Sequence, residues 1–251
     1  MNRPIPWKTA WITGASTGIG RDIARQLAAQ GVKVAASARS AEKLAELGSD
    51  ILAVPLDVTD SAACKAAVEL IEAVIGPIDL AVFGAGTYSP VAVDDLQPDV
   101  FAGMMGTNYM GVVNCLSALA PRMLARKSGQ ISWIASVAGY VGLPKAAAYG
   151  PTKAALINLG ESLYPEMKAG GVRLSVINPG FVETPLTAQN DFPMPFLMKP
   201  EEAARRSIEG LAAGRFEIAY PRRFVAILKA ARALPYPLFF RLIARTVLKS
   251  G

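Results

Sequence analysis

The residues of this chain best suited to chemistry are a tyrosine and a lysine, the first and last positions of Tyr149-Gly150-Pro151-Thr152-Lys153. On a helix, a spacing of four residues places both side chains on one face. A free phenol has a pKa of about 10, and a nearby ammonium lowers that pKa by favouring the phenolate. The pair therefore predicts proton transfer to a carbonyl oxygen or from an alcohol. Taken singly, the two could also be a core-edge tyrosine and a solvated helix charge.

A second candidate is the glycine-rich segment that follows the first apolar run. It has the spacing G-x-x-x-G-x-G, with Gly14, Gly18 and Gly20 separated by small or apolar residues. A strand precedes it and a helix follows, so glycines there let the backbone approach a pyrophosphate at the helix N-terminus. We expect a dinucleotide to contact Gly14, Ser16, Thr17, Gly18, Ile19 and Gly20. A simple strand–helix turn is the alternative.

The cofactor preference is predicted from the end of the second strand, where Ser37-Ala38-Arg39-Ser40 contains no acid. An acidic residue there would bind the adenosine ribose hydroxyls, whereas an arginine suits a 2′-phosphate. Arg39 thus favours NADP over NAD. It could also be a solvated surface arginine.

Strands and helices are predicted to alternate along the whole chain. The expected strands are Thr9–Thr13, Val32–Ala38, Ile51–Pro55, Ile78–Gly84, Gln130–Ala135, Val172–Ile177 and Phe216–Tyr220. The expected helices are Ile19–Gln30, Ala41–Leu47, a segment ending at Ile75 and capped by Asp60 or Ser61, Pro98–Lys127, Tyr149–Lys168 and Pro200–Ala213. This order predicts an α/β, Rossmann-type doubly wound parallel sheet of about seven strands with helices on both faces. The segment Gly180–Lys199 lacks periodicity and is a candidate lid.

Taken together and in this order, these motifs resemble the short-chain dehydrogenase/reductase family in its single-domain form. They are the glycine loop, Ser136 after the fifth strand, the Tyr-x-x-x-Lys start of a helix and Asn178-Pro179-Gly180 after the sixth strand. The resemblance covers about residues 7–220. It implies that Tyr149 is the acid/base, that Ser136 orients the substrate oxygen, that Lys153 holds the nicotinamide ribose and that Asn108 supports a proton-relay water.

The resemblance also implies further cofactor contacts, which are softer than those of the glycine loop. They are Asp57, Ala85, Gly86, Pro179, Gly180, Val182 and Thr184. One departure stands out: the family's usual Asn-Asn-Ala-Gly after the fourth strand is Phe83-Gly84-Ala85-Gly86 here. We expect Phe83 packing or water to compensate for the missing amides.

The substrate is predicted to be hydrophobic, because the lid is rich in aromatic, leucine, methionine and proline residues and binding pockets are mostly apolar. The residues expected to line the pocket are Tyr88, Tyr140, Leu143, Phe181 and Leu186. Simple packing of the lid on the core is the alternative.

Composition excludes several classes of protein. The 251 residues contain no histidine, which excludes a Ser-His-Asp triad or a His-ligated metal, and no metal site is expected. Two cysteines give no disulfide framework, which favours a reducing cytoplasm. The net charge of +6 comes from the end of the chain: residues 1–217 hold 19 basic and all 20 acidic side chains. A nucleic-acid partner is therefore disfavoured.

The chain is accordingly divided into a catalytic domain over 1–220 and a basic amphipathic helical extension over 221–251. In the second helix of this extension Arg241, Arg245 and Lys249 share one face. Such a helix could contact an anionic membrane surface peripherally, or pack on a subunit or on the substrate entrance.

The sequence as a whole predicts an NADP(H)-dependent oxidoreductase acting on a hydrophobic carbonyl/secondary alcohol pair. The family resemblance implies a homodimer or homotetramer that uses the helices over 98–127 and 149–168. The alternative from another class is a non-catalytic NADP-binding regulator or scaffold with the same fold.

Overall fold

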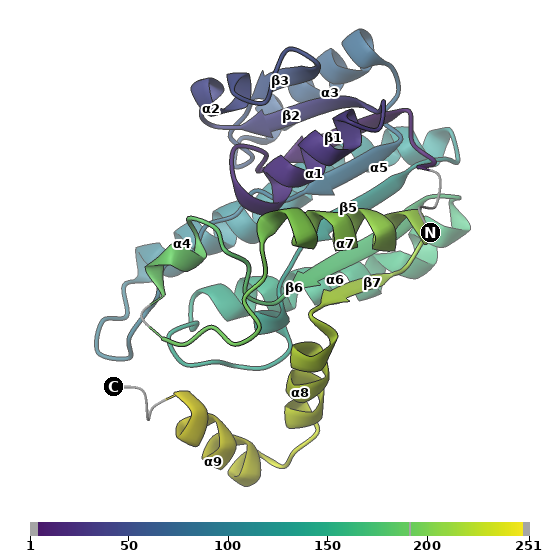
Figure 1. The fold of residues 1–251 in the computed structure, drawn as a ribbon. Coiled ribbons are helices and arrows are strands. Elements are labelled where there is room, and N and C mark those ends of the chain that lie inside the picture. Colours follow the sequence, from purple (N-terminus) through teal and green to yellow (C-terminus); the bar gives the residue numbers. More distant parts are fainter. Residues whose placement is uncertain (1–4, 191, 248–251) are drawn as a thin grey trace.

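The computed structural model describes residues 5–190 and 192–247, with side chains described up to Ala244. Its centre is a seven-stranded sheet in the order β3-β2-β1-β4-β5-β6-β7, with every neighbouring pair parallel. The strands are β1 (Thr9–Thr13), β2 (Lys33–Ala38), β3 (Ile51–Pro55), β4 (Leu80–Phe83), β5 (Gln130–Ile134), β6 (Arg173–Pro179) and β7 (Glu217–Tyr220). The predicted fold class is thus confirmed (Figure 1).

Helices cover both faces of this sheet and bury it in two cores. One core packs α3 (Ser61–Ile75), α5 (Gly111–Ala125) and α6 (Tyr149–Ala169) around buried Trp11, Phe83 and Trp133. The other packs α1 (Gly18–Ala28), α2 (Ala41–Ala45) and α7 (Pro200–Ala212) on the opposite face. Strands buried on both sides explain the near-continuous apolar runs of the sequence.

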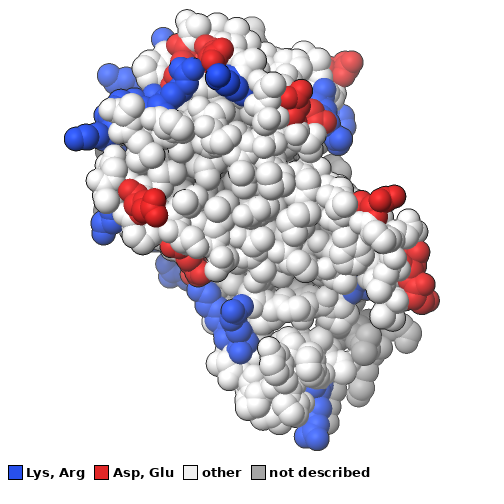
Figure 2. Space-filling view, turned by 180° about the vertical axis from the view of Figure 1, so that it is seen from behind, with Lys and Arg blue, Asp and Glu red and all other residues white. Residues whose placement is uncertain are grey.

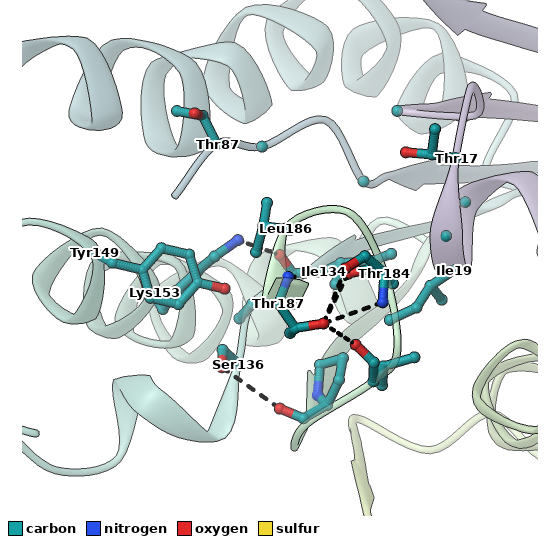
Figure 3. Close-up of a pocket in the computed structure, with 18 of the residues that line it drawn as sticks. Thr17, Ile19, Thr87, Ile134, Ser136, Tyr149, Lys153, Thr184, Leu186 and Thr187 are labelled. Carbon is teal, nitrogen blue, oxygen red and sulfur yellow. Dashed lines mark hydrogen bonds between the residues drawn. The ribbon is translucent and has the colours of Figure 1, made fainter. Parts of the chain in front are cut away.

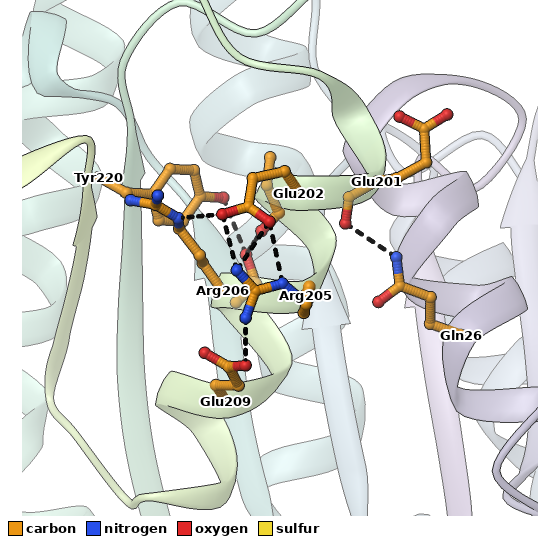
Figure 4. Close-up of polar contacts among 9 residues, drawn as sticks. Gln26, Glu201, Glu202, Arg205, Arg206, Glu209 and Tyr220 are labelled. Carbon is orange, nitrogen blue, oxygen red and sulfur yellow. Dashed lines mark hydrogen bonds and ion pairs between the residues drawn. The ribbon is translucent and has the colours of Figure 1, made fainter. Parts of the chain in front are cut away.

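The helix α7 is attached to its neighbours by polar contacts as well as by its apolar face. Figure 4 shows Arg205 held between Glu202 and Glu209 along the helix. Gln26 of α1 donates to the backbone oxygen of Glu201 at 2.9 Å. The hydroxyls of Ser207 and Tyr220 lie 2.8 Å apart and join α7 to β7. The bonds of Gln26 and Tyr220 therefore attach α7 to α1 and to the last strand.

The expected helix over Pro98–Lys127 is found as one helical run from Pro98 to Ala125, but it is not α-helical throughout. The segment forms α4 (Pro98–Met105), a single π-turn η1 (Gly106–Met110) and α5. An extra residue in one turn rotates the side chains that follow it, and such π-bulges are frequent at functional sites. Asn108 lies inside this turn and is fully buried.

Two segments at the carboxyl edge of the sheet lie outside the layers. The loop after β6 has a short helix η3 (Thr187–Gln189), and its ends are joined by an isolated bridge between Val182 and Met198. After β7 the chain forms α8 (Arg222–Arg232) and α9 (Tyr236–Val247), which extend away from the sheet in yellow in Figure 1. The side chain of Arg245 and all of Lys249 lie outside the described residues. Among the described residues, none of the helices combines the length and apolar composition that crossing a membrane requires.

Candidate active site

The glycine loop between β1 and α1 is built for close backbone approach. Gly14 and Gly18 have φ of +68° and +58°, conformations that favour glycine. A Cβ on Gly14 would lie 2.4 Å from the Gly84 oxygen, and one on Gly20 would lie 2.5 Å from the Gly14 oxygen. Thr17 is the N-cap of α1, but its side chain makes no capping bond. The first N–H groups of the helix and its positive dipole end therefore face the loop, and they fit a phosphate.

A cavity of ≈ 200 Å³ opens beside this loop, where the strand order reverses between β1 and β4. Ligands of open α/β sheets bind at such a switch point. Most residues expected to contact the cofactor line this cavity: Gly14, Ser16, Thr17, Gly18, Ile19, Gly20, Gly86, Tyr149, Lys153, Pro179, Gly180, Val182 and Thr184. Figure 3 shows Thr17 and Ile19 at one end and Tyr149 with Ser136 at the other.

Three other expected contacts lie beside the cavity. Arg39 directly follows β2 and is exposed. The end of β2 lies next to the glycine loop, since the Ala15 N–H donates to the Ser37 oxygen at 3.1 Å. Asp57 accepts bonds from the backbone N–H and hydroxyl of Thr59 at 2.9 and 2.8 Å. These bonds, with a smaller effect from the charge of Arg39, lower the pKa of Asp57. Ala85 donates its N–H to the Thr13 hydroxyl.

The catalytic candidates come together from three elements. Tyr149 begins α6, Lys153 lies one turn later, and Ser136 follows β5. The Lys153 ammonium lies 5.4 Å from the centre of the Tyr149 ring and donates to the Ile134 oxygen at 2.9 Å. Lys153 as a whole is only 4% exposed. Its ammonium has three N–H donors, and those not used by the Ile134 oxygen suit acceptors such as ribose hydroxyls.

Burial controls protonation in this pair. It raises the pKa of Tyr149 to about 12, against an opposing hydrogen bond from Ser136. It lowers the pKa of Lys153 to about 8. The expected lowering of the Tyr149 pKa by Lys153 is thus not found: burial of the phenol, with a smaller effect from Tyr88, raises the pKa. Tyr149 keeps its proton at neutral pH, which is the state that can protonate a carbonyl.

Asn108 connects the π-turn to the rim of the cavity. Its Oδ1 accepts from the Thr87 N–H at 2.7 Å, and its Nδ2 donates to the Thr87 oxygen at 3.0 Å and to the Thr152 hydroxyl at 3.1 Å. All three contacts are within the protein, so Asn108 positions Thr87. A Cβ on Gly86 would lie 3.2 Å from its Oδ1 and 3.8 Å from the Lys153 Nζ.

Two threonines that line the cavity were not expected from the sequence. Thr87 is held by Asn108, and Thr187 donates its hydroxyl to the Val182 oxygen at 2.6 Å. Thr87 reaches the site through its tertiary contact with Asn108, whereas the Thr187 hydroxyl bonds Val182 and Thr184 within the lid, and no motif marks either residue. Their position after Gly86 and inside the lid was the available signal.

The unusual Phe83-Gly84 pair is compensated within the protein. The Phe83 ring is buried and packs edge-on against Trp11, with ring centres 5.5 Å apart. The Gly84 N–H donates to the oxygen and the hydroxyl of Thr13 at 3.1 and 3.2 Å. A Cβ on Gly84 would lie 3.0 Å from Ile134, so this strand end has no room for a larger residue without a shift.

A second cavity of ≈ 390 Å³ lies on the far side of Tyr149 and Ser136. Of the residues expected to bind substrate, Tyr88, Leu143, Phe181 and Leu186 line it. Tyr140 does not: its hydroxyl donates to Glu217 at 2.6 Å, behind the cavity wall. Residues that line both cavities are Ser136, Tyr149, Gly180, Leu186 and Thr187. Tyr149 and Ser136 therefore lie at the junction of a glycine-lined cleft and an apolar pocket.

Comparison with known proteins decides the family. A family model described as short chain dehydrogenase matches residues 8–193. This chain belongs to the short-chain dehydrogenase family. An uncharacterized oxidoreductase of Myxococcus xanthus is 38% identical over 240 residues, covering 93% of this chain and 95% of the relative. Another, from Staphylococcus haemolyticus, is 34% identical and covers 81% of this chain and 90% of the relative.

Solved structures of short-chain dehydrogenases share the fold. One from Burkholderia cenocepacia in complex with NADP has a TM-score of 0.85 at 24% identity, covering 96% of this chain and 99% of that chain. One from Burkholderia phymatum in complex with NAD has a TM-score of 0.83 at 24% identity, covering 91% and 94%. These structures show the fold, and the family match with the curated relatives shows that the protein is an oxidoreductase of this family. Among the described residues, no group of acidic and cysteine side chains is arranged to hold a metal ion.

Proposed function

We propose that this protein is an NADP(H)-dependent oxidoreductase that interconverts a hydrophobic carbonyl compound and its secondary alcohol. The observation that carries the proposal is the position of Tyr149 and Ser136 at the junction of the two cavities. A carbonyl oxygen bound there would meet both hydroxyls, while the rest of the substrate would occupy the apolar pocket. Structural relatives bound to NAD and to NADP support a nicotinamide cofactor in the first cavity.

A nicotinamide cofactor bound in the first cavity would supply the hydride that the carbonyl carbon accepts. The residues of this chain manage the oxygen. Ser136 polarises it by hydrogen bonding, and Tyr149 donates the proton that converts it to a hydroxyl. Lys153 holds the ribose hydroxyls and supplies positive charge beside the phenol. In the oxidative direction each transfer is reversed.

The preference for NADP is proposed from Arg39. Its exposed guanidinium lies beside the glycine loop at the end of β2, where the adenosine ribose of a bound dinucleotide would lie. The described residues give it no ion-pair partner within 4 Å, although Asp57 is close enough for its pKa to respond. A 2′-phosphate would therefore find an available fork of donors.

The test is cofactor oxidation by purified wild type and Tyr149→Phe over a panel of hydrophobic aldehydes and ketones. We expect wild type to turn over with NADPH at a higher kcat/KM than with NADH. Tyr149→Phe should lose at least about 100-fold in kcat while NADPH binding, measured by calorimetry, is retained. Substantial turnover by Tyr149→Phe would remove its role. NADPH binding without turnover in wild type would favour the scaffold alternative.

Two finer features of assembly are part of this proposal. A homodimer or homotetramer would use the layer formed by α4, α5 and α6, and exposed Met105, Met110 and Leu124 support an interface there. Peripheral contact with an anionic membrane would use the outer face of α9, where Tyr236 and Phe240 are exposed and stacked at 5.6 Å.

A further inference from the structure

The second cavity is closed on one side by the two helices that follow the last strand. Six of the residues that line it come from α8 and α9: Phe224, Ile227, Leu228, Ala231, Leu242 and Ile243. Ile227 is 53% exposed, so its side chain borders a space open to solvent. An exposed aliphatic side chain on a pocket wall is a typical binding surface.

This wall is held in place from behind by a polar cluster. Glu217 on β7 accepts from the Lys229 ammonium at 2.5 Å and from the Tyr140 hydroxyl at 2.6 Å. Arg232 donates to the Tyr140 backbone oxygen at 2.5 Å. Burial raises the pKa of Glu217, but the bonds from Lys229 and Tyr140 outweigh it, so the carboxylate stays ionised at neutral pH. The cluster fixes α8 against the domain.

The inner face of α8 also joins the lid. The rings of Phe181 and Phe224 stack with centres 5.6 Å apart, and Phe196 lies 6.1 Å from Phe224. Phe196 has a φ of +60°, a strained conformation for a bulky residue. The aromatic contacts of Phe181 and Phe196 with Phe224 link the lid to α8.

The chemistry of the lining selects the ligand. Among the described residues that line this cavity, no side chain carries a charge, and the polar ones are Tyr88, Ser136, Tyr149, Thr187 and Asn190. Ser136, Tyr149 and Thr187 belong to the part shared with the first cavity. Polar groups thus concentrate where the reacting oxygen would lie, and the α8–α9 side is aliphatic.

We infer that α8 and α9 determine substrate specificity by selecting an uncharged carbonyl compound or alcohol with an extended aliphatic chain. The oxygen binds at Tyr149, and the chain runs along Ile227, Leu228 and Leu242. The inference rests on the proposed function for its reaction and on the cavity for its selectivity. A charged group on the aliphatic part of the chain would lose water without meeting an opposite charge among the described lining residues, so we expect it to be disfavoured.

The experiment compares propanal with decanal as substrates of wild type, Ile227→Trp and Ala226→Trp. Ile227 tolerates a larger side chain because it is half exposed. Ala226 is exposed on the same helix and does not line the cavity, so it is the matched control. We expect Ile227→Trp to lower kcat/KM for decanal by at least about tenfold, with propanal within about twofold and Ala226→Trp like wild type. Equal effects on both aldehydes, or no effect on decanal, overturn the inference.

A binding measurement separates this inference from the proposed function. Calorimetry with decanol, and with its analogue carrying a carboxylate at the other end of the chain, needs no turnover. We expect decanol to bind wild type and Ala226→Trp equally, and Ile227→Trp and the charged analogue to bind at least about tenfold more weakly. If Ile227→Trp binds decanol as tightly as wild type, the helices do not determine specificity, even if hydride transfer is found. If binding is selective but no aldehyde is turned over, the proposed reaction is contradicted and the specificity inference stands.

Discussion

At the scale of single residues, the active-site pair shows one physical effect acting in opposite directions. Burial favours the neutral form of every ionisable group. For Tyr149 the neutral form carries the proton, so its pKa rises, and for Lys153 the neutral form lacks it, so its pKa falls. The result is a protonated phenol beside an ammonium whose charge is lost under mildly alkaline conditions.

The pH dependence of cofactor use follows from these directions. We expect kcat/KM for NADPH, measured at saturating aldehyde, to be flat near neutrality and to fall above about pH 8, because the ammonium of Lys153 is lost as the pH rises through its pKa of about 8. Tyr149 does not cause this limb, since its pKa of about 12 leaves it protonated there. In Lys153→Arg the limb should disappear, because a guanidinium stays charged. A limb that persists in this variant assigns it to another group.

At the scale of elements, the strands and the glycine loop could be predicted from local sequence. Apolar runs such as Thr9–Thr13 and Ile51–Pro55 have their predicted bounds, because buried parallel strands leave a local signal. The Tyr149–Lys153 pair depends on spacing within one helix and is equally local. The π-turn at Gly106–Met110 has no such signal, since it is stabilised by contacts of Asn108 with a distant loop.

The π-turn has a testable purpose. We expect Asn108→Ala to lower the free energy of unfolding by about 1–3 kcal/mol, because it leaves the Thr87 backbone groups unpaired, and to weaken NADPH binding as Thr87 moves from the cavity rim. Gln130→Ala is the matched control. Its buried side chain bonds Trp7, Ser175 and the Leu211 oxygen at the start of β5, the end of the strand away from the first cavity, so it should cost stability without changing NADPH affinity. If both variants change affinity equally, the effect on the cofactor is merely structural.

The wall that α8 and α9 form along the second cavity is another feature that could not be predicted from local sequence. Ile227 and Leu242 follow an amphipathic pattern that suits a membrane, a subunit or a pocket equally well. Only the tertiary position of α8 against Glu217 and Phe181 assigns their inner faces to the cavity.

At the scale of the whole molecule, the net charge of +6 comes from the segment after residue 217, which includes α8 and α9. Figure 2 shows basic and no acidic side chains on the visible face of the lower lobe, formed by α8 and α9. The same lobe exposes Tyr236, Leu238 and Phe240 at 75%, 50% and 60%. Aromatic and basic side chains together suit an anionic lipid interface.

We therefore expect the protein to sediment with vesicles containing phosphatidylserine at low salt and to be released by high salt. Phe240→Ser should reduce this binding. Val74→Ser is the control, because Val74 is 57% exposed but belongs to α3, which lies at the opposite end of the molecule from α9 (Figure 1). Equal sedimentation of the two variants, or none by wild type, contradicts membrane contact through α9.

The position of α8 and α9 at the end of the chain has a consequence for biosynthesis. Every strand of the sheet and every residue around the first cavity precede α8, and a growing chain emerges from its N-terminus. The nucleotide cleft can therefore form while the ribosome is still adding the helices that bound the second cavity. If the domain folds as it emerges, the first cavity forms before the second, and a dinucleotide could bind the nascent chain before α8 and α9 bound the substrate pocket.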